Sequence, residues 1–482
     1  MATWIYVIVR ASNVSFTNDE AISYGIIHGA QTFVDTPNNQ WLNTLLMRVS
    51  QYVFGQSELA LRLPNVAAFG LYGAASVMLL SQVRHVEAKA VGFSLLVVNP
   101  FLLEFFGLAR GYGLSLAFLA AAFACVFFAR PTLSARWELG RLVLVGVFGS
   151  LAFYANFSAL NLILALLTVE VIDLVVRRSR REVIVQAGYR LAAVVIVCLT
   201  AVSLIPGILQ LQHLQAIGQL YYGGHSGFIS DTIGSLLGAS SCGYGCTPSW
   251  LTAGETLVVV VAGLAVAWAV ARYMLAPAWS NVQRTALLFT IAVLAVLLES
   301  LLLGTLFPID RTALDYVVAF AALVAFVVDD FATVVSRRTV RLLLGTVTAC
   351  FVTLVSVNFA QDANLTRTTI WAYDASSRQV INAVIRFERQ RGQPSYPWRL
   401  ISGFPRNEAL EYYRLRFKLT WLQPVTREPA STPDGDLYDV SAAEVPELPP
   451  GTTILASFPE TATELRVAPR ATREVLVGRP HD

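Results

Sequence analysis

Long apolar stretches recur along most of the chain, and each is about the length of one membrane crossing. A helix rises about 1.5 Å per residue and the hydrocarbon layer is about 30 Å thick, so one span needs about 20 mostly apolar residues. Charged residues or Gly, Pro and polar punctuation separate the stretches from one another. The predicted spans lie at residues 60–82, 88–105, 110–129, 140–155, 158–176, 191–211, 253–272, 285–307, 312–331 and 341–359.

The amino-terminal apolar run, Trp4–Val9, is too short for a full span because Arg10 follows it. It predicts a partial first helix, or an authentic start upstream of Met1. With this helix the sequence predicts an all-α polytopic membrane protein of about 11 transmembrane helices.

Arginine placement predicts the orientation of the spans, because cytoplasmic loops retain positive charge. Alternate loops carry most of the basic residues, and we place these loops in the cytoplasm: Arg84 and Lys89; Arg130, Arg136 and Arg141; Arg177, Arg178, Arg180 and Arg181; Arg272 and Arg284; Arg337, Arg338 and Arg341. The first outer loop then comprises residues 12–58. Within it, Asn18–Phe33 and Gln40–Phe54 carry apolar residues at helical spacing, which predicts two amphipathic helices in the membrane interface.

Two further outer regions follow from the same topology. The loop 212–252 contains Cys242 and Cys246 in the string CGYGC, and an oxidising compartment favours a local disulfide over a thiol pair or a metal site. After a transmembrane domain at 1–359, residues 360–482 become polar and predict a small soluble α/β extracytoplasmic domain. Helical patterns lie at Ser376–Gln390 and Asn407–Lys418, and a strand pattern lies at Thr453–Phe458.

Composition excludes several classes of protein. Hydrophobic residues make up 55% of the 482 positions and charged residues only 14%, and the mean hydropathy is +0.57, whereas an ordinary soluble domain carries about 25% charged residues. A soluble enzyme, a disordered chain and a disulfide scaffold are therefore excluded. The polar tail balances its basic and acidic residues, so no nucleic-acid partner is expected. The expected location is the inner or plasma membrane.

The sharpest candidate for chemistry is the acid pair Asp19 and Glu20 at the start of a predicted outer helix. Carboxylates favour the positive end of a helix dipole, which is the structural interpretation. In the functional interpretation, a carboxylate at the membrane surface acts as the general base toward an acceptor hydroxyl.

Two arginines stand where outer loops re-enter apolar helices: Arg110 in LARGYGLSL and Arg311 in LFPIDRTALDY. Such an arginine either snorkels to lipid headgroups or uses its planar donors to bind a phosphate. Their location on the same side as Asp19 favours phosphate binding. Glu299 is predicted to pair or to line a cavity, whereas Glu104 could simply be solvated; both are candidates for a supporting role, as is Tyr112.

Several strings along residues 16–320 resemble the GT-C superfamily of lipid-dependent glycosyltransferases, in particular its protein mannosyltransferase and aminoarabinose transferase-like branch. The strings are FTNDEAISYG, FGQSELALRLPNVAAFGLYG, NPFLLEFFGLARGYGLSLAFLAAAFA and FPIDRTALDY. The resemblance implies a polyprenyl-phosphate-linked sugar donor. It maps the essential acid of the superfamily's first outer loop to Asp19, with Glu20 adjacent.

The function expected from this resemblance is transfer of a sugar to an acceptor hydroxyl or amine on a glycan, lipid or protein at the extracytoplasmic face. Asp19 would take the acceptor proton during inverting attack, and Arg311, or in second place Arg110, would stabilise the leaving phosphate. Glu20 would orient the acceptor or join a divalent metal ion, and metal dependence stays open.

The alternatives are a non-enzymatic lipid or solute transporter, and the same fold used as a polymer ligase or a degenerate partner subunit. A transporter predicts a continuous polar path to the cytoplasm. The inner halves of the predicted spans carry few charged residues away from loop ends, which favours catalysis near the outer face.

Overall fold

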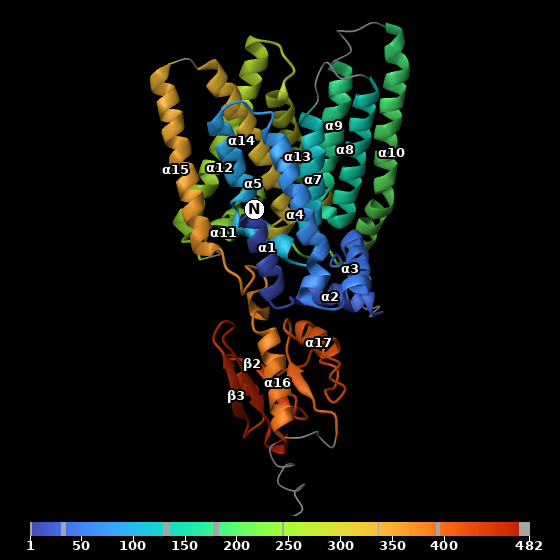
Figure 1. Cartoon of the computed structure of the whole chain (residues 1–482), viewed down its shortest axis with the longest axis vertical. Coiled ribbons are helices and arrows are strands. Elements are labelled where there is room, and N and C mark those ends of the chain that lie inside the picture. The colour runs from blue at the N-terminus through green and yellow to red at the C-terminus, as the bar shows by residue number, and fades with distance from the viewer. Residues whose placement is uncertain are drawn as a thin grey trace, which may run out of the picture. The chain divides into compact units, whose positions relative to one another are not determined.

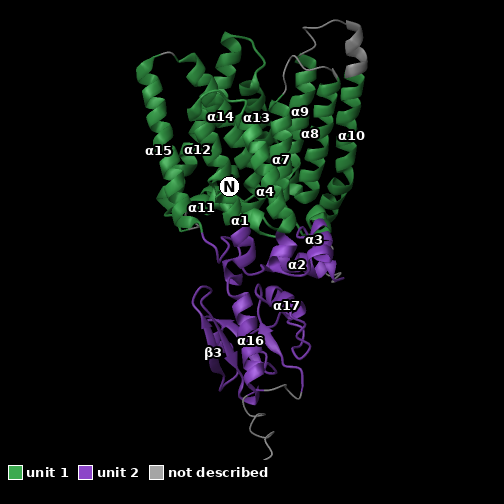
Figure 2. Ribbon diagram, viewed as in Figure 1, with its two compact units in different colours: residues 1–7, 40–45, 63–363 green, residues 8–39, 46–62, 364–482 purple. Residues whose placement is uncertain are grey.

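The computed structural model describes residues 2–29, 35–128, 135–176, 183–242, 245–335, 337–391 and 396–471. The chain divides into two compact units that interleave in sequence (Figure 2). Unit 1 comprises Met1–Val7, Gln40–Leu45 and Leu63–Ala363, and unit 2 comprises Ile8–Asn39, Leu46–Arg62 and Asn364–Asp482. Most of the first outer loop therefore shares a unit with the C-terminal region.

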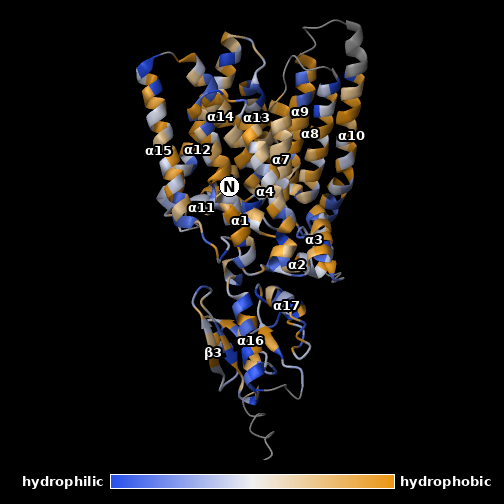
Figure 3. Cartoon of the chain, in the orientation of Figure 1, coloured by the Kyte–Doolittle hydropathy of each residue, from blue (hydrophilic) through white to orange (hydrophobic). Residues whose placement is uncertain are grey.

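Unit 1 is built of long apolar helices that run side by side (Figure 1) and are mostly hydrophobic along their length (Figure 3). The helices of the chain up to its last long apolar helix are α1 (Ala2–Asn13), α2 (Asn18–Ile27), α3 (Trp41–Phe54), α4 (Glu58–Leu80), α5 (Val86–Val97), α6 (Pro100–Glu104), α7 (Gly111–Phe127), α8 (Ala135–Ala155), α9 (Leu160–Val176), α10 (Val183–Ala216), α11 (Gly234–Cys242), α12 (Pro248–Leu275), α13 (Asn281–Leu303), α14 (Leu314–Val334) and α15 (Arg338–Asp362).

The helices coincide with the apolar stretches of the sequence, and the chain is a polytopic membrane protein. Among the described residues, eight helices are long and apolar enough to cross a membrane, or nine if one bent pair counts as a span. The expected number of about eleven is reached only by adding α1 and α7, which have 12 and 17 residues. The partial first helix inferred from Arg10 is α1.

The bent pair corrects the continuous span expected at 88–105. Helix α5 ends at Val97, and α6 restarts at Pro100 at an angle of 47°. Proline lacks the N–H that a continuing helix needs, but it fits the first position of a new one. Asn99 caps that new helix by accepting a hydrogen bond from the backbone N–H of Leu102, 3.2 Å away.

The two helices of the first outer loop differ in how they present their side chains. On α3 the apolar side chains of Leu45, Val49, Tyr52 and Val53 are exposed at helical spacing, as expected for a helix that contacts lipid. Helix α2 instead buries its polar residues, including Asp19, Glu20 and Ser23. It ends at Ile27, before the expected Phe33, and Phe33 itself lies outside the described residues.

The C-terminal part of unit 2 contains two helices and a four-stranded sheet. The helices are α16 (Ser377–Arg391) and α17 (Asn407–Arg416), and the strands are β1 (Leu400–Ser402), β2 (Leu437–Ser441), β3 (Thr453–Phe458) and β4 (Thr463–Val467). The strand order is β1-β2-β4-β3, with β1 parallel to β2 and the other pairs antiparallel. Ile401, Tyr438 and Val440 are among the residues of its core.

Candidate functional site

The start of helix α2 is fixed by a capping box. The Thr17 hydroxyl and backbone N–H both donate to Oε2 of Glu20, at 3.0 and 2.9 Å, while the Glu20 N–H points back to the Thr17 hydroxyl at 3.4 Å. A capping box satisfies backbone groups that a helix start leaves unpaired. Helix α2 therefore begins at a defined residue, one position before Asp19.

Glu20 also forms a fully buried ion pair with Arg62. Arg62 donates through Nε to Oε1 and through a terminal nitrogen to Oε2, both at 2.7 Å, and both side chains have no exposed surface. Arg62 further donates to the carbonyls of Ala11, Val14 and Ser15. Both oxygens of Glu20 are thus engaged in holding the loop, which favours a structural role over direct contact with an acceptor or metal.

Asp19 lies beside Glu20 and is buried, with 6% of its surface exposed. Another acid of unit 2, Asp374, accepts a hydrogen bond from the backbone N–H of Asn18 at 2.6 Å. Burial raises the pKa of the Asp374 carboxyl well above its ordinary value, and the nearby charges of Asp19 and Glu20 raise it further. The Asn18 N–H and Arg406 oppose this increase.

Aromatic and charged residues of the C-terminal region pack against the segment that precedes α2. The Phe16 ring stacks on Tyr412 with centroids 3.9 Å apart, and the Phe16 N–H donates to the Tyr413 hydroxyl at 2.9 Å. Tyr413 in turn donates to Glu58, which also pairs with Arg378 at 2.6 Å. The acid-bearing loop is therefore supported by chain segments more than 300 positions away.

In unit 1, Arg110 occupies the residue before α7 and is fully buried, with its guanidinium carbon 5.8 Å from the centroid of the Tyr112 ring. Three amides fix this loop. The Gly111 N–H donates to Gln40, the Asn43 side chain donates to the Ala109 carbonyl, and Asn65 accepts from the Leu114 N–H.

The glycines of the RGYG string are required by close packing. A Cβ atom on Gly111 would lie 1.8 Å from the carbonyl oxygen of Ala155, and one on Gly113 would lie 2.7 Å from that of Phe105. Only glycine fits at such a close approach between backbones. The segment that carries Arg110 and Tyr112 therefore packs closely against the backbone at Ala155 and Phe105.

Arg311 lies against a second tyrosine. Its guanidinium carbon is 3.9 Å from the centroid of the Tyr222 ring, and it donates to the Tyr222 hydroxyl at 3.0 Å. That hydroxyl donates to Asp310 at 2.6 Å. Burial raises the pKa of Tyr222, Arg311 lowers it, and Asp310 and Tyr112 raise it further. Arg110 and Arg311 thus each lie against a tyrosine, and we call Arg110, Tyr112, Tyr222 and Arg311 the arginine–tyrosine cluster.

The remaining predicted residues have separate environments. Glu299 accepts a hydrogen bond from the Asn161 side chain at 3.0 Å. Glu104 is 2% exposed, which excludes the solvated alternative. Cys246 takes part in a disulfide bond, while the side chain of Cys242 lies outside those that the structure describes, so their pairing stays a prediction.

A metal ion has little support at the acid pair. In the part of the chain that the structure describes, no group of three or more His, Cys, Asp or Glu residues is arranged to hold a metal ion. Arg62 and Thr17 already donate hydrogen bonds to the oxygens of Glu20. No chemical step is assigned to a divalent ion.

Sequence reasoning missed three contributors. The capping box had a readable signal in Thr17-Asn18-Asp19-Glu20, which matches the capping pattern of Thr followed three residues later by Glu. Tyr222 and Asp374 had none, because each meets its partner across a long stretch of sequence.

No protein-family model matches the chain, and no curated protein matches it in sequence. Among solved structures, the apo form of ArnT from Cupriavidus metallidurans aligns with 100% of this chain and 98% of its own, at 13% identity and a TM-score of 0.54. The form bound to undecaprenyl phosphate aligns over 96% of each chain, at 13% identity and a TM-score of 0.55. The chain has the fold of ArnT.

ArnT is an aminoarabinose transferase and a GT-C membrane glycosyltransferase, so the ArnT fold is that of the superfamily that the sequence resembles. The likeness extends over 100% of this chain and therefore includes both of its units. At 13% identity the likeness shows the fold alone.

Proposed function

We propose that the chain is a membrane glycosyltransferase that moves a sugar from a polyprenyl-phosphate-linked donor to an acceptor hydroxyl or amine. The arginine–tyrosine cluster is the observation that carries the proposal, because in it each of two cations lies against a tyrosine ring in a membrane protein. The full-length likeness to ArnT, which was crystallised bound to undecaprenyl phosphate, supports a donor of this class.

The cluster is suited to the lipid phosphate. Guanidinium groups present planar donors that match phosphate oxygens, and such charge-assisted hydrogen bonds are about twice as strong as neutral ones. Arg311 is the first candidate for this contact because Tyr222 and Asp310 orient it. Arg110 is the second, and it lies over the Tyr112 ring. Negative charge grows on the phosphate as the sugar leaves, so fixed cations there lower the barrier.

Asp19 is the proposed general base. It would accept the proton of the acceptor hydroxyl or amine while the acceptor atom forms a bond to the anomeric carbon. The bond from that carbon to the phosphate oxygen breaks on the opposite face, which inverts the configuration, and its electron pair leaves with the lipid phosphate. A positioned base of this kind contributes about 100- to 10,000-fold in rate.

Glu20 and Asp374 are proposed to position Asp19. Glu20 fixes the first turn of α2 through Thr17 and Arg62, and Asp374 holds the backbone N–H of Asn18. Neither is assigned a proton transfer. The acid-bearing loop and the C-terminal region are proposed to face the extracytoplasmic side, where lipid-linked donors meet glycan, lipid or protein acceptors.

The test measures transfer of labelled sugar from a panel of polyprenyl-phosphate sugars to envelope acceptors in membranes. We expect Asp19→Asn to reduce transfer at least 100-fold, while the exposed acid Asp35, changed to Asn in the same loop, serves as the matched control. Full transfer by a folded Asp19→Asn variant would show that the base is another group. Absence of transfer by the wild-type protein from every donor would contradict the proposed donor class.

A further inference from the structure

Helix α16 has two distinct sides. Val380, Ile381, Val384 and Phe387 are buried and join α16 to its own domain. The other side carries Asn382, Ile385, Arg386 and Arg389, which follow the i, i+3, i+4, i+7 spacing of one helical face. These four residues line a pocket.

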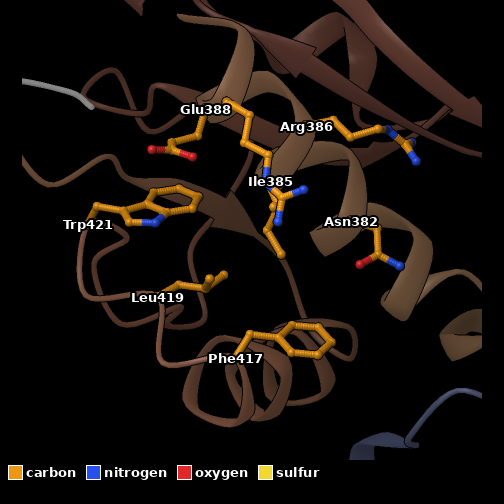
Figure 4. A pocket seen from close by; sticks show the side chains of 8 residues that line it. Asn382, Ile385, Arg386, Glu388, Phe417, Leu419 and Trp421 are labelled. Atoms are coloured by element: carbon orange, nitrogen blue, oxygen red, sulfur yellow. The ribbon is translucent and has the colours of Figure 1, made fainter. Parts of the chain in front are cut away.

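The pocket has a volume of about 530 Å³, within the range of about 300–1,000 Å³ typical of ligand sites. The α16 face and Glu388 form one wall. Phe417, Leu419 and Trp421, from the segment after α17, form the other (Figure 4). Both walls belong to the C-terminal part of unit 2, so the pocket is complete within that unit.

The basic groups of the pocket differ from most arginines around them. Arg378, Arg399, Arg406 and Arg414 are engaged in ion pairs. Arg386 and Arg389 are exposed and, in the described parts of the chain, form no ion pair or hydrogen bond. Two guanidinium groups against the one carboxylate of Glu388 leave the pocket with an excess of positive charge. This excess favours a ligand that carries a carboxylate or phosphate.

The opposite wall offers flat apolar surface in fixed positions. Trp421 packs edge-on against Trp398, with ring centroids 6.0 Å apart, and Phe417 stacks on Tyr413 at 5.9 Å. The indole of Trp421 remains partly exposed. A large aromatic ring of this kind has an apolar body and, in tryptophan, a polar N–H. It suits the C–H face of a sugar ring, whose hydroxyl groups need polar partners such as Asn382 and Glu388.

We propose that this pocket binds an anionic saccharide, a sugar chain that carries carboxylate or phosphate groups. The combination of cations with a flat aromatic wall carries the assignment, since neither feature alone selects this class. If the chain is a glycosyltransferase, which rests on the function proposed above, the saccharide is its acceptor. An acidic peptide shares the charge, but it lacks the rigid C–H face that would use the Trp421 ring.

The test is direct binding to the detergent-purified full chain by calorimetry, with tetragalacturonate as the probe. Maltotetraose serves as the neutral sugar and tetraglutamate as the acidic peptide. We expect tetragalacturonate to bind at least ten times more tightly than either. The double variant Arg386→Gln/Arg389→Gln and the variant Trp421→Ala should each weaken it at least ten-fold. The matched control is Arg427→Gln, because Arg427 belongs to the same C-terminal part but lies over the Phe404 ring, outside the pocket.

Binding is measured without turnover, so the inference and the proposed function can fail separately. Asp19→Asn should bind tetragalacturonate as the wild type does, even if it transfers no sugar. Equal binding of the acidic peptide would assign the pocket to peptides instead. No binding by the folded wild-type protein, or unchanged binding by the double arginine variant, would overturn the inference.

Discussion

Arg62 holds Glu20 through two parallel hydrogen bonds of 2.7 Å, with neither side chain exposed. Breaking a buried pair from one side leaves an uncompensated charge, which costs about 3–5 kcal/mol. We therefore expect Arg62→Gln to lower the thermal unfolding midpoint of the purified protein clearly. The exposed Arg48, changed to Gln in the same loop, should leave the midpoint unchanged.

Variants of the same ion pair distinguish a structural role of Glu20 from a catalytic role. Glu20→Gln combined with Arg62→Gln should recover part of the stability that Arg62→Gln loses, because the unpaired carboxylate is then removed. A Glu20→Gln variant that melts like the wild type but loses transfer would argue for direct participation of Glu20.

The packing of Gly111 predicts a steric effect. Gly111→Ala places a Cβ atom against the carbonyl of Ala155, whereas a Cβ atom on the helical Gly140 would meet nothing within 4 Å. We expect Gly111→Ala to destabilise the protein and to disturb the Arg110 loop. Gly140→Ala should be neutral or stabilising by about 0.5–1 kcal/mol, because alanine favours helix interiors. Unfolding midpoints of the two variants provide the comparison.

Asp374 predicts a pH dependence of stability. Its pKa is raised in the folded protein by burial and by Asp19 and Glu20, while Arg406 and the Asn18 N–H oppose the increase. Between the ordinary Asp pKa of about 3.9 and the raised value, the folded state binds more protons than the unfolded state. This group's contribution to stability therefore falls as pH rises through that window, by at most about 1.4 kcal/mol per pH unit.

The variant Asp374→Asn should remove this contribution. Unfolding midpoints measured from pH 4 upward should decline less steeply than those of the wild type. Parallel pH profiles of the two proteins would mean that Asp374 has an ordinary pKa in the folded state.

Tyr222 predicts weaker binding of the lipid phosphate when its hydroxyl is lost. Tyr222→Phe removes the acceptor of the Arg311 hydrogen bond, so the guanidinium is less well oriented. We expect undecaprenyl phosphate to bind about five- to ten-fold more weakly, which corresponds to one hydrogen bond of about 1 kcal/mol. Tyr221→Phe at the exposed neighbouring position is the matched control. Equal affinities for both variants would remove Arg311 from the proposed phosphate site.

The arginine distribution predicts the sidedness of the C-terminal region. Protease added to intact spheroplasts should cleave within residues 364–482, because this region is proposed to lie outside the cytoplasm. The cytoplasmic loops should be cut only after lysis. Protection of the C-terminal region in intact cells would reverse the proposed topology.

Local patterns in the sequence predicted much of the secondary structure. The span at 285–307 and the tail helix at Ser376–Gln390 appear as α13 and α16, and the strand at Thr453–Phe458 appears as β3. In each case hydrophobic periodicity within one element determines the outcome. The bend at Pro100 was missed although the Asn99-Pro100 dipeptide signals a helix break, because the apolar run continues on both sides of it.

The candidate site was less predictable because its contacts join distant parts of the sequence. Arg110 and Arg311 are conspicuous in the sequence because charges are rare at the ends of apolar helices. Their partners Tyr112 and Tyr222 do not differ in this way from the residues around them. Asp374 accepts a hydrogen bond from Asn18, which lies 356 positions earlier in the sequence. The hydrophobic periodicity of neither segment predicts this contact. The hydrogen bonds between Glu20 and Thr17 could be predicted from the capping-box pattern, whereas the ion pair between Glu20 and Arg62 could not.

The stacking of Phe16 on Tyr412 has a consequence for how the protein is made. The Phe16 N–H bonds to a residue 397 positions later, so unit 2 cannot close until nearly the whole chain has been synthesised. While the membrane helices of unit 1 are inserted, the first loop still lacks the contacts that Phe16 makes with Tyr412 and Tyr413. Such long-range closure is slow and leaves apolar surface open to aggregation. Truncation of the last 70 or so residues should therefore damage the very first loop to be made.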